Sequence, residues 1–302
     1  MTPKLPLNAS ASIPNTILAK RQLSDEIWRM DIVAPHIAEE RKTGQFVILQ
    51  VDSDFGERIP LTIADADTQI GSITVVFQTV GHTTHKLASL NPGDCVGGLL
   101  GPLGRPTEIK KTGRVVCVGG GIGVAPAYPI VQAHKNIGNH VTMIIGARTK
   151  DLIIFENEIG AVVDELIVCT DDGSHKRKAL VTAPLKELCE SSTPPNLVIA
   201  IGPPAMMRFC ADVTRPFNIP TVVSLNTIMI DGTGMCGGCR VTVGGETKFV
   251  CVDGPEFDGH KVDFDNMTKR MRIYRESEES SHKRFHDGCN LMATPQNGEQ
   301  SQ

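Results

Sequence analysis

The sequence lacks the features that mark membrane, secreted and nucleic-acid-binding proteins. None of its 302 residues lies in a run near the roughly 18 apolar residues that a membrane span needs. Residues 1–14 lack the charged start and long apolar block of a secretory signal. With 30 basic and 34 acidic residues, the chain has no positive excess with which to attract nucleic acid. We therefore expect no membrane and no nucleic acid among its partners.

A disulfide framework is also missing. The nine cysteines are an odd number with no regular spacing, unlike the paired cysteines of small secreted domains. A reducing, cytoplasmic location fits this pattern best. Only three cysteines, at 236, 239 and 251, form a cluster. The others are interpreted as small core residues or incidental thiols: Cys95, Cys117, Cys169, Cys189, Cys210 and Cys289.

The first hundred residues have the pattern of an antiparallel β-barrel. Short alternating or β-branched runs are separated by turn sequences such as Asn91-Pro92-Gly93-Asp94. A small closed or nearly closed barrel is the natural architecture for such strands. The expected strands include Trp28–Val33, Gln45–Val51, Ser72–Val80 and Asp94–Leu100.

From Arg114 the pattern changes to strands that alternate with helices, which predicts a parallel sheet. The expected strands are Val115–Val118, Val141–Ile145, Leu166–Cys169 and Leu197–Ile201. The expected helices are Ala125–Asn136, Glu156–Val163, Val181–Glu190 and Ala205–Thr214. After Val223 the chain becomes rich in glycine and cysteine, and its last 40 or so residues are polar. Helix is expected over Lys269–Lys283 and disorder over Thr294–Gln302.

The fold class that we predict is therefore multidomain β plus α/β, with a small C-terminal cluster domain. The length suits two or three globular units at about 100–200 residues each. The predicted segments are an N-terminal extension (1–14), a β-barrel (15–110), an α/β nucleotide domain (111–222), a cluster domain (223–265), and a C-terminal helix with a polar tail (266–302).

The most specific motif is Asp231-x4-Cys236-x2-Cys239-x11-Cys251. Plant-type ferredoxins hold a [2Fe–2S] cluster with cysteines at this spacing, and here aspartate occupies the first position. Three soft thiolates can bind iron and an ionised carboxylate can supply a fourth, harder ligand. Nearby glycines allow the backbone to curl around the cluster. A hairpin over Thr242–Val250, with Gly244-Gly245 at its turn, is expected to return the chain to Cys251.

Other interpretations of these residues remain open at this point. A zinc site with three cysteines and one aspartate uses the same residue types. A thioredoxin-like redox pair is disfavoured because the sequence after Cys239 is typical of a strand rather than a helix. Unligated cysteines are disfavoured because Cys236-Gly-Gly-Cys239 lies in a glycine-rich loop, and an aspartate ligand could leave the cluster labile.

A second motif, Gly119, Gly120, Gly121 and Gly123, lies between a predicted strand and a predicted helix. Glycines there allow a pyrophosphate to approach the backbone, next to the helix N-terminus. The spacing departs from G-x-G-x-x-G, and a purely structural turn is the alternative. Asp171, after the third parallel strand, would accept hydrogen bonds from a ribose 2′-OH and so favours NAD(H). The basic run 175–178 could instead bind the 2′-phosphate of NADP(H), or be a solvated loop.

Taken together, the motifs resemble the ferredoxin–NADP reductase superfamily. Arg58-Ile59-Pro60-Leu61-Thr62 is similar to its flavin motif, with Pro60 in place of the usual tyrosine. Within the superfamily the chain resembles the small (alpha) subunits of NADH-dependent reduced ferredoxin:NADP oxidoreductase, also called sulfide dehydrogenase, over about residues 15–275. Further matches are Val80-Gly81-His82-Thr83-Thr84, Gly101-Pro102-Leu103-Gly104 and Ile201-Gly202-Pro203-Pro204-Ala205-Met206. Electron-transfer subunits of dihydroorotate dehydrogenase are related, but typically have cysteine where Asp231 stands.

The resemblance implies three cofactors: FAD, a [2Fe–2S] cluster and NAD(H) or NADP(H). It places Arg58, Thr83 and Thr84 at the FAD phosphates, and Val76 and Phe77 near the flavin ring or adenine. Pro60, Leu61, Thr62 and Gly81 belong to the same flavin-binding motifs. The Gly202-Pro203 turn would lie beside the nicotinamide ribose. Asp231, Cys236, Cys239 and Cys251 would bind the cluster.

The implied activity is that of an electron-transfer flavoprotein subunit acting on NAD(P)H. Electrons would pass between the nicotinamide, FAD and the cluster to a larger flavin and iron–sulfur partner subunit, and through it to ferredoxin. No side chain is assigned a catalytic acid or base role, because hydride transfer needs none. The alternatives are an electron-transfer subunit of dihydroorotate dehydrogenase, or a zinc-stabilised nucleotide-binding regulator without redox activity.

Overall fold

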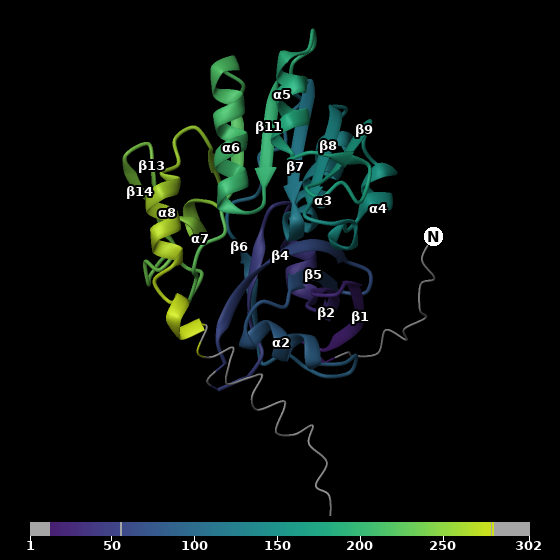
Figure 1. The fold of residues 1–302 in the computed structure, drawn as a ribbon. Coiled ribbons are helices and arrows are strands. Elements are labelled where there is room, and N and C mark those ends of the chain that lie inside the picture. Colours follow the sequence, from purple (N-terminus) through teal and green to yellow (C-terminus); the bar gives the residue numbers. More distant parts are fainter. Residues whose placement is uncertain (1–12, 55, 279, 281–302) are drawn as a thin grey trace, which may run out of the picture.

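The computed structural model describes residues 13–54, 56–278 and 280. Two large sheets lie end to end, and a small C-terminal region packs against the side of both (Figure 1). Among the described residues, no helix is long and apolar enough to cross a membrane.

The N-terminal sheet is an antiparallel, nearly closed barrel with strand order β1-β2-β5-β4-β3-β6. The Ile17 N–H donates to the Asp94 carbonyl, and Thr16 forms an isolated bridge with Cys95, so residues of the segment before β6 bond to the opposite edge. The strands are β1 (Ile17–Ser24), β2 (Ile27–Val33), β3 (Phe46–Gln50), β4 (Arg58–Asp67), β5 (Ser72–Gln78) and β6 (Gly98–Leu103). The helices are α1 (Pro35–Glu40) and α2 (His82–Ser89).

Alternate residues of β5 face two different apolar cores, one inside the barrel and one at the neighbouring domain. Along β5, Ile73, Val75 and Phe77 alternate into the barrel core, where each is at most 1% exposed. Val76 points to the opposite face and joins a different core cluster, together with Val124 of the neighbouring domain. The two large domains therefore share an apolar interface.

The second sheet has strand order β10-β9-β8-β7-β11-β12-β15 and is parallel apart from its last strand. Its strands are β7 (Arg114–Gly120), β8 (His140–Ala147), β9 (Glu165–Thr170), β10 (Arg177–Lys178), β11 (Leu197–Ile201) and β12 (Thr221–Ser224). Its helices are α3 (Val124–Asn136), α4 (Glu156–Gly160), α5 (Thr182–Glu190) and α6 (Pro204–Thr214). Short 3₁₀ turns are η1 (Gly121–Gly123), η2 (Lys150–Leu152) and η3 (Arg215–Phe217).

Helices cover both faces of this sheet, so its strands are continuous apolar runs. Along β7, Val115 and Cys117 pack on the side of α3, whereas Val116 and Val118 pack on the side of α5 and α6. The carboxyl end of β7 leads into η1, which contacts β5 of the barrel. Figure 1 shows β11 running toward the barrel, so the carboxyl ends of the parallel strands face it. Ligands of open α/β sheets bind at such ends.

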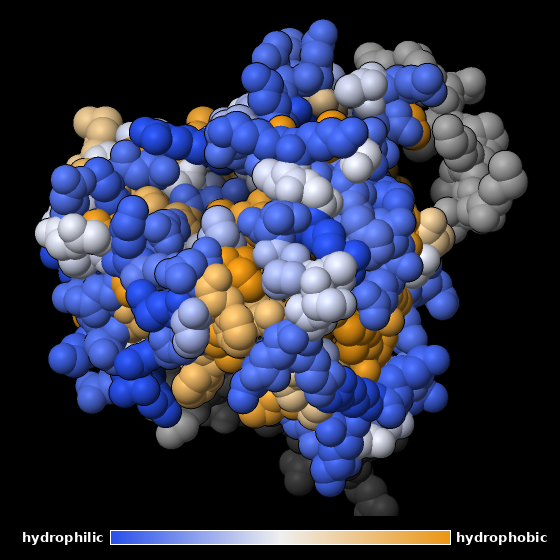
Figure 2. All heavy atoms as spheres, turned by 90° about the horizontal axis from the view of Figure 1, so that it is seen from above, coloured by the Kyte–Doolittle hydropathy of each residue, from blue (hydrophilic) through white to orange (hydrophobic). Residues whose placement is uncertain are grey.

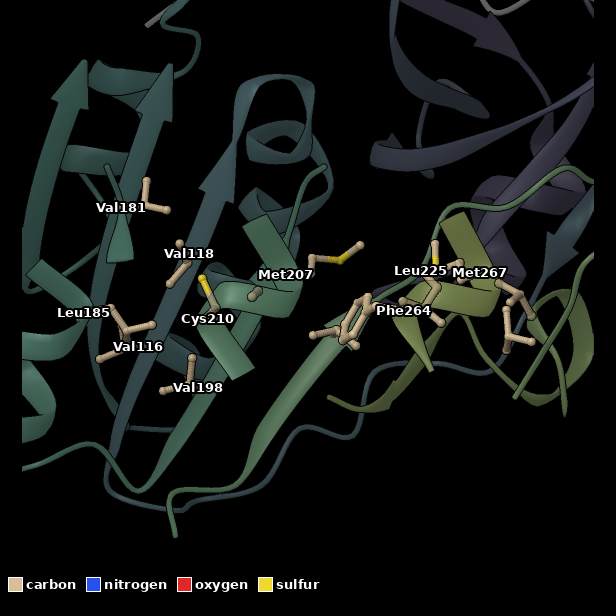
Figure 3. Packing of buried hydrophobic residues seen from close by; sticks show 14 of the residues in the cluster. Val116, Val118, Val181, Leu185, Val198, Met207, Cys210, Leu225, Phe264 and Met267 are labelled. Atoms are coloured by element: carbon tan, nitrogen blue, oxygen red, sulfur yellow. The ribbon is translucent and has the colours of Figure 1, made fainter. Parts of the chain in front are cut away.

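The C-terminal region is built on both large sheets. Its elements are β13 (Arg240–Val243), β14 (Glu246–Phe249), α7 (Val250–Asp253), β15 (Glu256–Asp258) and α8 (Phe264–Met271). β15 adds an antiparallel strand to the edge of the parallel sheet, beside β12. Phe264 and Met267 of α8 pack near Leu225, next to the core of the nucleotide domain (Figure 3).

The structure confirms the predicted fold class and most of the predicted elements. The β13–β14 hairpin has Gly244-Gly245 at its turn, as expected. The strand expected over Asp94–Leu100 lies later, at Gly98–Leu103, because residues 93–96 instead bond to the β1 edge. The helix α8 begins earlier than the expected helix over Lys269–Lys283, and after a turn at 272–274 the residues 275–278 are helical again. Residues 281–302, with the expected disordered end and Cys289, lie outside the described residues, as do residues 1–12.

The described surface is mainly polar. In the view from above, hydrophilic side chains dominate and apolar ones gather in a central patch (Figure 2). Four of the six cysteines outside the cluster motif are buried, which confirms their interpretation as core residues: Cys117, Cys169, Cys189 and Cys210. Burial raises the pKa of each of these thiols, so they are inert. Cys95 is exposed.

Candidate functional site

Asp231, Cys236 and Cys239 lie in an irregular loop between β12 and β13 that contacts the barrel, and Cys251 lies in α7, after the β13–β14 hairpin. Gly232, Gly234 and Gly237 have positive φ angles, of 77°, 87° and 68°, which side chains rarely adopt. A Cβ atom at Gly232 would lie 2.7 Å from the Ile48 side chain of β3. The local fold therefore requires glycine here, and the loop is held directly on a barrel strand.

Asp231 is held as an ionised carboxylate. Its Oδ2 atom accepts hydrogen bonds from the Thr233 hydroxyl at 2.6 Å and from the backbone N–H groups of Thr233 and Met235 at 3.2 and 3.3 Å. These bonds, the Thr233 hydroxyl first and the Cys236 thiol second, hold the pKa of the carboxyl well below its usual range. Its Oδ1 atom is buried and has no hydrogen-bond partner among the described residues. A buried carboxylate oxygen without a partner is costly, and a metal would satisfy it.

Two of the three thiols are buried and adjacent. The Sγ atoms of Cys239 and Cys251 lie 3.2 Å apart, and each residue is 2% exposed. Burial raises the pKa of Cys251 to about 12, so the thiolate forms only if a bound cation compensates its charge. Cys236 is exposed, and its sulfur accepts a hydrogen bond from the Gly238 N–H at 3.4 Å.

The four side chains form two pairs rather than one ring. The Cys236 thiol is close enough to the Asp231 carboxylate to lower the pKa of that carboxyl, and Cys239 lies beside Cys251. Among the described residues, no three histidine, cysteine, aspartate or glutamate side chains converge on one point where a single ion could bind. A structural zinc ion needs four donors around one centre. The residues present fit a group with two metal centres better than they fit zinc.

The glycine motif is the tight turn at the end of β7. A Cβ atom at Gly123 would lie 2.2 Å from the Ile201 carbonyl oxygen, and one at Gly120 would lie 2.4 Å from the Met206 sulfur. Gly119 and Gly202 are similarly crowded, so these glycines allow β7, β11 and α6 to pack closely. At Gly121, where φ is +54°, a Cβ would meet no atom within 4 Å. That open position is where a ligand can approach the backbone.

The residues after β9 include an acidic and a basic candidate for contacts with the adenosine ribose of the nucleotide, and their surroundings differ. Asp171 is exposed at the carboxyl end of the sheet, next to β8. His175 lies 2.8 Å from Glu156, and Arg177 forms a two-point ion pair with Glu187. Two of the four residues in the basic run are therefore already paired with carboxylates. This pairing disfavours the run as a phosphate site.

The predicted flavin residues line two adjacent parts of the barrel. Arg58, Pro60, Leu61 and Thr62 lie on β4, with Arg58 exposed and 3.5 Å from the Gln50 amide oxygen. Gly81 precedes α2, where the Thr84 hydroxyl accepts hydrogen bonds from the N–H groups of Val80 and Gly81. The Thr83 hydroxyl donates to Glu57, the neighbour of Arg58. The two motifs are therefore brought together.

Two of the proposed FAD contacts are buried. Phe77 is 1% exposed inside the barrel core, and Val76 is 7% exposed at the interface with α3. Pro203 is the residue just before α6, and a Cβ atom at Gly120 would lie 3.3 Å from its Cδ atom. Because η1 contacts β5 and Val76 of β5 packs with α3, the glycine loop lies next to this strand of the barrel.

Comparisons with known proteins identify the two C-terminal units. Residues 226–263 match the iron–sulfur cluster binding domain of dihydroorotate dehydrogenase B, and residues 117–212 match the oxidoreductase NAD-binding domain. A dihydroorotate dehydrogenase B electron transfer subunit homologue of Thermotoga maritima is 45% identical over 271 residues, covering 90% of this chain and 95% of its own. The corresponding subunit of Bacillus caldolyticus is 34% identical, covering 82% and 96%.

The chain belongs to the dihydroorotate dehydrogenase B electron transfer subunit family. The chain is also similar to a solved structure described as NADH-dependent reduced ferredoxin-NADP oxidoreductase, with 44% sequence identity and a TM-score of 0.86. The match covers 91% of this chain and 99% of the other. The expected family, fold and oxidoreductase activity are thereby confirmed, as are the cofactor types: an iron–sulfur cluster, FAD and a nicotinamide nucleotide.

For this electron transfer subunit, the sequence did not indicate several residues that support the cluster loop. Thr233, which orients Asp231, follows it by two positions, a spacing typical of local side-chain hydrogen bonds. Arg240 and Arg270 donate to the carbonyls of Gly237 and Gly238. Arg270 lies 32 residues beyond Gly238, and no local pattern links the two.

Proposed function

We propose that this electron transfer subunit passes electrons from NADH, through FAD in the barrel, to a [2Fe–2S] cluster bound by Asp231, Cys236, Cys239 and Cys251. The observation that carries the proposal is the pairing of the four side chains, with one carboxylate oxygen buried and unsatisfied. When bound, these cofactors supply the hydride and single-electron chemistry, and the protein positions them.

The contacts around the cluster loop support this assignment. The loop rests on Ile48 of β3, and the Arg105 N–H at the end of β6 donates to the Gly254 carbonyl at 2.7 Å. The Arg105 guanidinium also contacts the Val252 carbonyl and the Asp253 carboxylate, the two residues that directly follow Cys251. The barrel that binds flavin and the loop that binds iron are thus joined by backbone and ionic contacts, which fixes their separation.

For the nucleotide we propose NAD(H) rather than NADP(H). Asp171 offers an exposed carboxylate to the adenosine ribose, and it would repel a 2′-phosphate. The pairing of Arg177 with Glu187 and of His175 with Glu156 reduces the positive charge available to such a phosphate. The open backbone at Gly121 is the proposed contact for the pyrophosphate.

We further propose that the cluster passes electrons to a larger flavin and iron–sulfur subunit, and through it to ferredoxin. The relatives named above are subunits of larger enzymes. Exposed apolar side chains surround the exposed Cys236 edge of the loop: Ile230 is 50%, Met235 89% and Val252 38% exposed. Such a patch is typical of a protein interface. Free cysteine thiols at the site require a reducing compartment, which favours the cytoplasm.

The second candidate is a dihydroorotate dehydrogenase subunit, which the names of several relatives favour. Asp231 favours the first candidate, because cysteine is typical of that position in dihydroorotate dehydrogenase subunits. Co-purification of the tagged chain with its native partner separates the two. A partner with several iron–sulfur centres supports the first candidate, and a dihydroorotate-oxidising flavoprotein supports the second.

The deciding experiment for the cofactors is anaerobic purification with iron, zinc, sulfide and flavin analysis. We expect two iron atoms and one FAD per chain, with visible absorption from both. A colourless protein that contains one zinc ion would overturn the proposal.

A further inference from the structure

Two arginines hold the tight turn between Cys236 and Cys239. The Arg240 guanidinium donates to the Gly237 carbonyl at 2.9 Å, and the Arg270 guanidinium donates to the Gly238 carbonyl at 3.3 Å. Gly237 and Gly238 are the only residues between the two cysteines. In both contacts the donor is a positively charged guanidinium group, which strengthens a hydrogen bond to a carbonyl.

Arg270 reaches the turn from a separate helix with a fixed position. It lies in the last turn of α8, where a positive charge is favourable for the helix dipole. Met267, three residues earlier, is 1% exposed and belongs to the same core cluster as Cys239 and Cys251. Figure 3 shows Met267 and Phe264 directed into that core. Because the helix is anchored on this side, its arginine is held beside the cysteine loop.

The two guanidinium groups share a partly enclosed cavity with the exposed cysteine. The cavity has a volume of about 250 Å³, and Cys236, Arg240 and Arg270 all line it. Most of its other walls are apolar, from Ile230, Val241, Met267, Met271, Ile273 and Tyr274. Because the Arg270 side chain is partly buried there, its charge is screened less than the charge of the exposed Arg240. Two permanent positive charges therefore act on the cysteine loop from the cavity side.

We propose that Arg240 and Arg270 are positioning residues for the cluster, which hold the Cys236–Cys239 turn and raise the cluster's reduction potential. The inference rests on the proposed function, since it assumes that these cysteines bind the cluster. Reduction adds one electron, delivered from the FAD, and changes no bond or proton at either arginine. The added negative charge is stabilised by nearby positive charge, so the arginines favour the reduced state.

The test compares charge-removing and charge-keeping variants in the full chain, purified anaerobically. For Arg240→Gln and Arg270→Gln we expect the ratio of reduced to oxidised cluster at a fixed potential to fall by about tenfold each. For a one-electron couple that is a decrease of about 59 mV in midpoint potential, measured by a redox titration followed by electron paramagnetic resonance. Arg270→Lys keeps the charge but loses the forked geometry, and it should stay close to the wild-type potential.

Arg272→Gln is the matched control. Arg272 lies two residues after Arg270, at the end of α8, is exposed and does not line the cavity. A shift in this control as large as that of Arg270→Gln would show a general charge effect and overturn the proposal. An unchanged midpoint in the Arg240→Gln/Arg270→Gln double variant would also overturn it.

The second proposed role, holding the Cys236–Cys239 turn in place, is tested by the rate at which a chelator removes iron from the protein. We expect faster loss in Arg270→Gln and Arg270→Lys than in Arg272→Gln, and equal rates would refute a clamp. If Arg270→Gln does not retain a cluster, the exposed Arg240→Gln variant still tests the potential. A wild-type protein without iron would instead refute the proposed function itself, so the two failures are distinguishable.

Discussion

The sulfur atoms of Cys239 and Cys251 lie 3.2 Å apart, although the two residues are separated by a complete β-hairpin. The distance is too long for a disulfide bond, which is about 2.05 Å. Two sulfurs at about 2.3 Å from one tetrahedral ion would lie roughly 3.7 Å apart, so a small adjustment allows them to share a metal. The hairpin β13–β14 thus closes one half of the proposed metal site, and the Asp231–Cys236 pair forms the other half.

Cys239→Ser should remove the cluster and leave FAD bound. A serine hydroxyl is a poor ligand for iron, whereas the barrel that carries the flavin motifs has its own core. We expect the iron content to fall from two atoms per chain to nearly none, with one FAD retained. Cys95→Ser, at an exposed barrel cysteine, is the control and should keep both. Loss of FAD from the Cys239 variant would contradict the independence of the two sites.

Asp231→Cys should keep a cluster but lower its potential. A thiolate donates more electron density to iron than a carboxylate does, which disfavours the reduced state. Voltammetry of the anaerobic protein measures the midpoint potential. Asp258→Cys, at an exposed carboxylate of β15, should leave the midpoint unchanged. An unchanged midpoint in Asp231→Cys would rule out ligation by that carboxylate.

Arg58→Ala should weaken FAD binding by about 10- to 100-fold, which corresponds to the loss of one charged hydrogen bond to phosphate. The flavin that remains with the protein after gel filtration reports the effect. The control is Arg21→Ala, an exposed arginine on β1, an edge strand that does not pair with β4. Equal flavin retention in the two variants would count against Arg58 as a phosphate ligand.

The predictable parts of this protein are those in which the pattern is local. The apolar runs of β7 and β8 and the spacing of Asp231, Cys236 and Cys239 depend on neighbouring residues only. By contrast, β15 has three residues and pairs with β12, about 35 residues earlier, so nothing near it in sequence marks it as a strand. The contact of Arg270 with the cysteine loop depends on how α8 docks, which is decided by tertiary packing.

The glycine motif does not by itself show which of its glycines admits a ligand, and the reason is physical. Gly119, Gly120 and Gly123 are needed for close packing of strands and helix, and Gly121 alone opens to solvent. A sequence cannot distinguish a glycine that admits a ligand from one that admits a neighbouring strand, because both require only the absence of a side chain.

Asp171→Asn should reduce the preference for NADH over NADPH. The variant loses the negative charge that would repel a 2′-phosphate, so we expect the ratio of the two dissociation constants to change by about tenfold. Binding titrations with both nucleotides measure that ratio. Asp151→Asn, in the exposed turn η2, is the control and should not change it. An unchanged ratio in Asp171→Asn would place the adenosine ribose elsewhere.

Glu256→Gln should stabilise the protein at alkaline pH. Glu256 of β15 is partly buried where the cluster region meets the barrel, and its Oε1 atom accepts a hydrogen bond from the Thr107 hydroxyl at 2.6 Å. Desolvation by burial raises the pKa of this carboxyl to about 7. Between its ordinary value of 4.5 and about 7, the folded state binds more protons than the unfolded state, so the free energy of unfolding decreases as pH rises through that window.

Glutamine resembles the protonated carboxyl and can still accept the Thr107 hydrogen bond, so the variant avoids burying a charge. At pH 8 we expect its free energy of unfolding to exceed the wild-type value by on the order of 1–3 kcal/mol, and at pH 4.5 the two should be nearly equal. Thermal unfolding at the two pH values measures the difference. Glu246→Gln is the control with the opposite sign, because Lys248 holds the pKa of the exposed Glu246 carboxyl below its usual range. A gain for Glu256→Gln that is the same at both pH values would show that the carboxyl does not titrate in this range, and that packing alone explains the change.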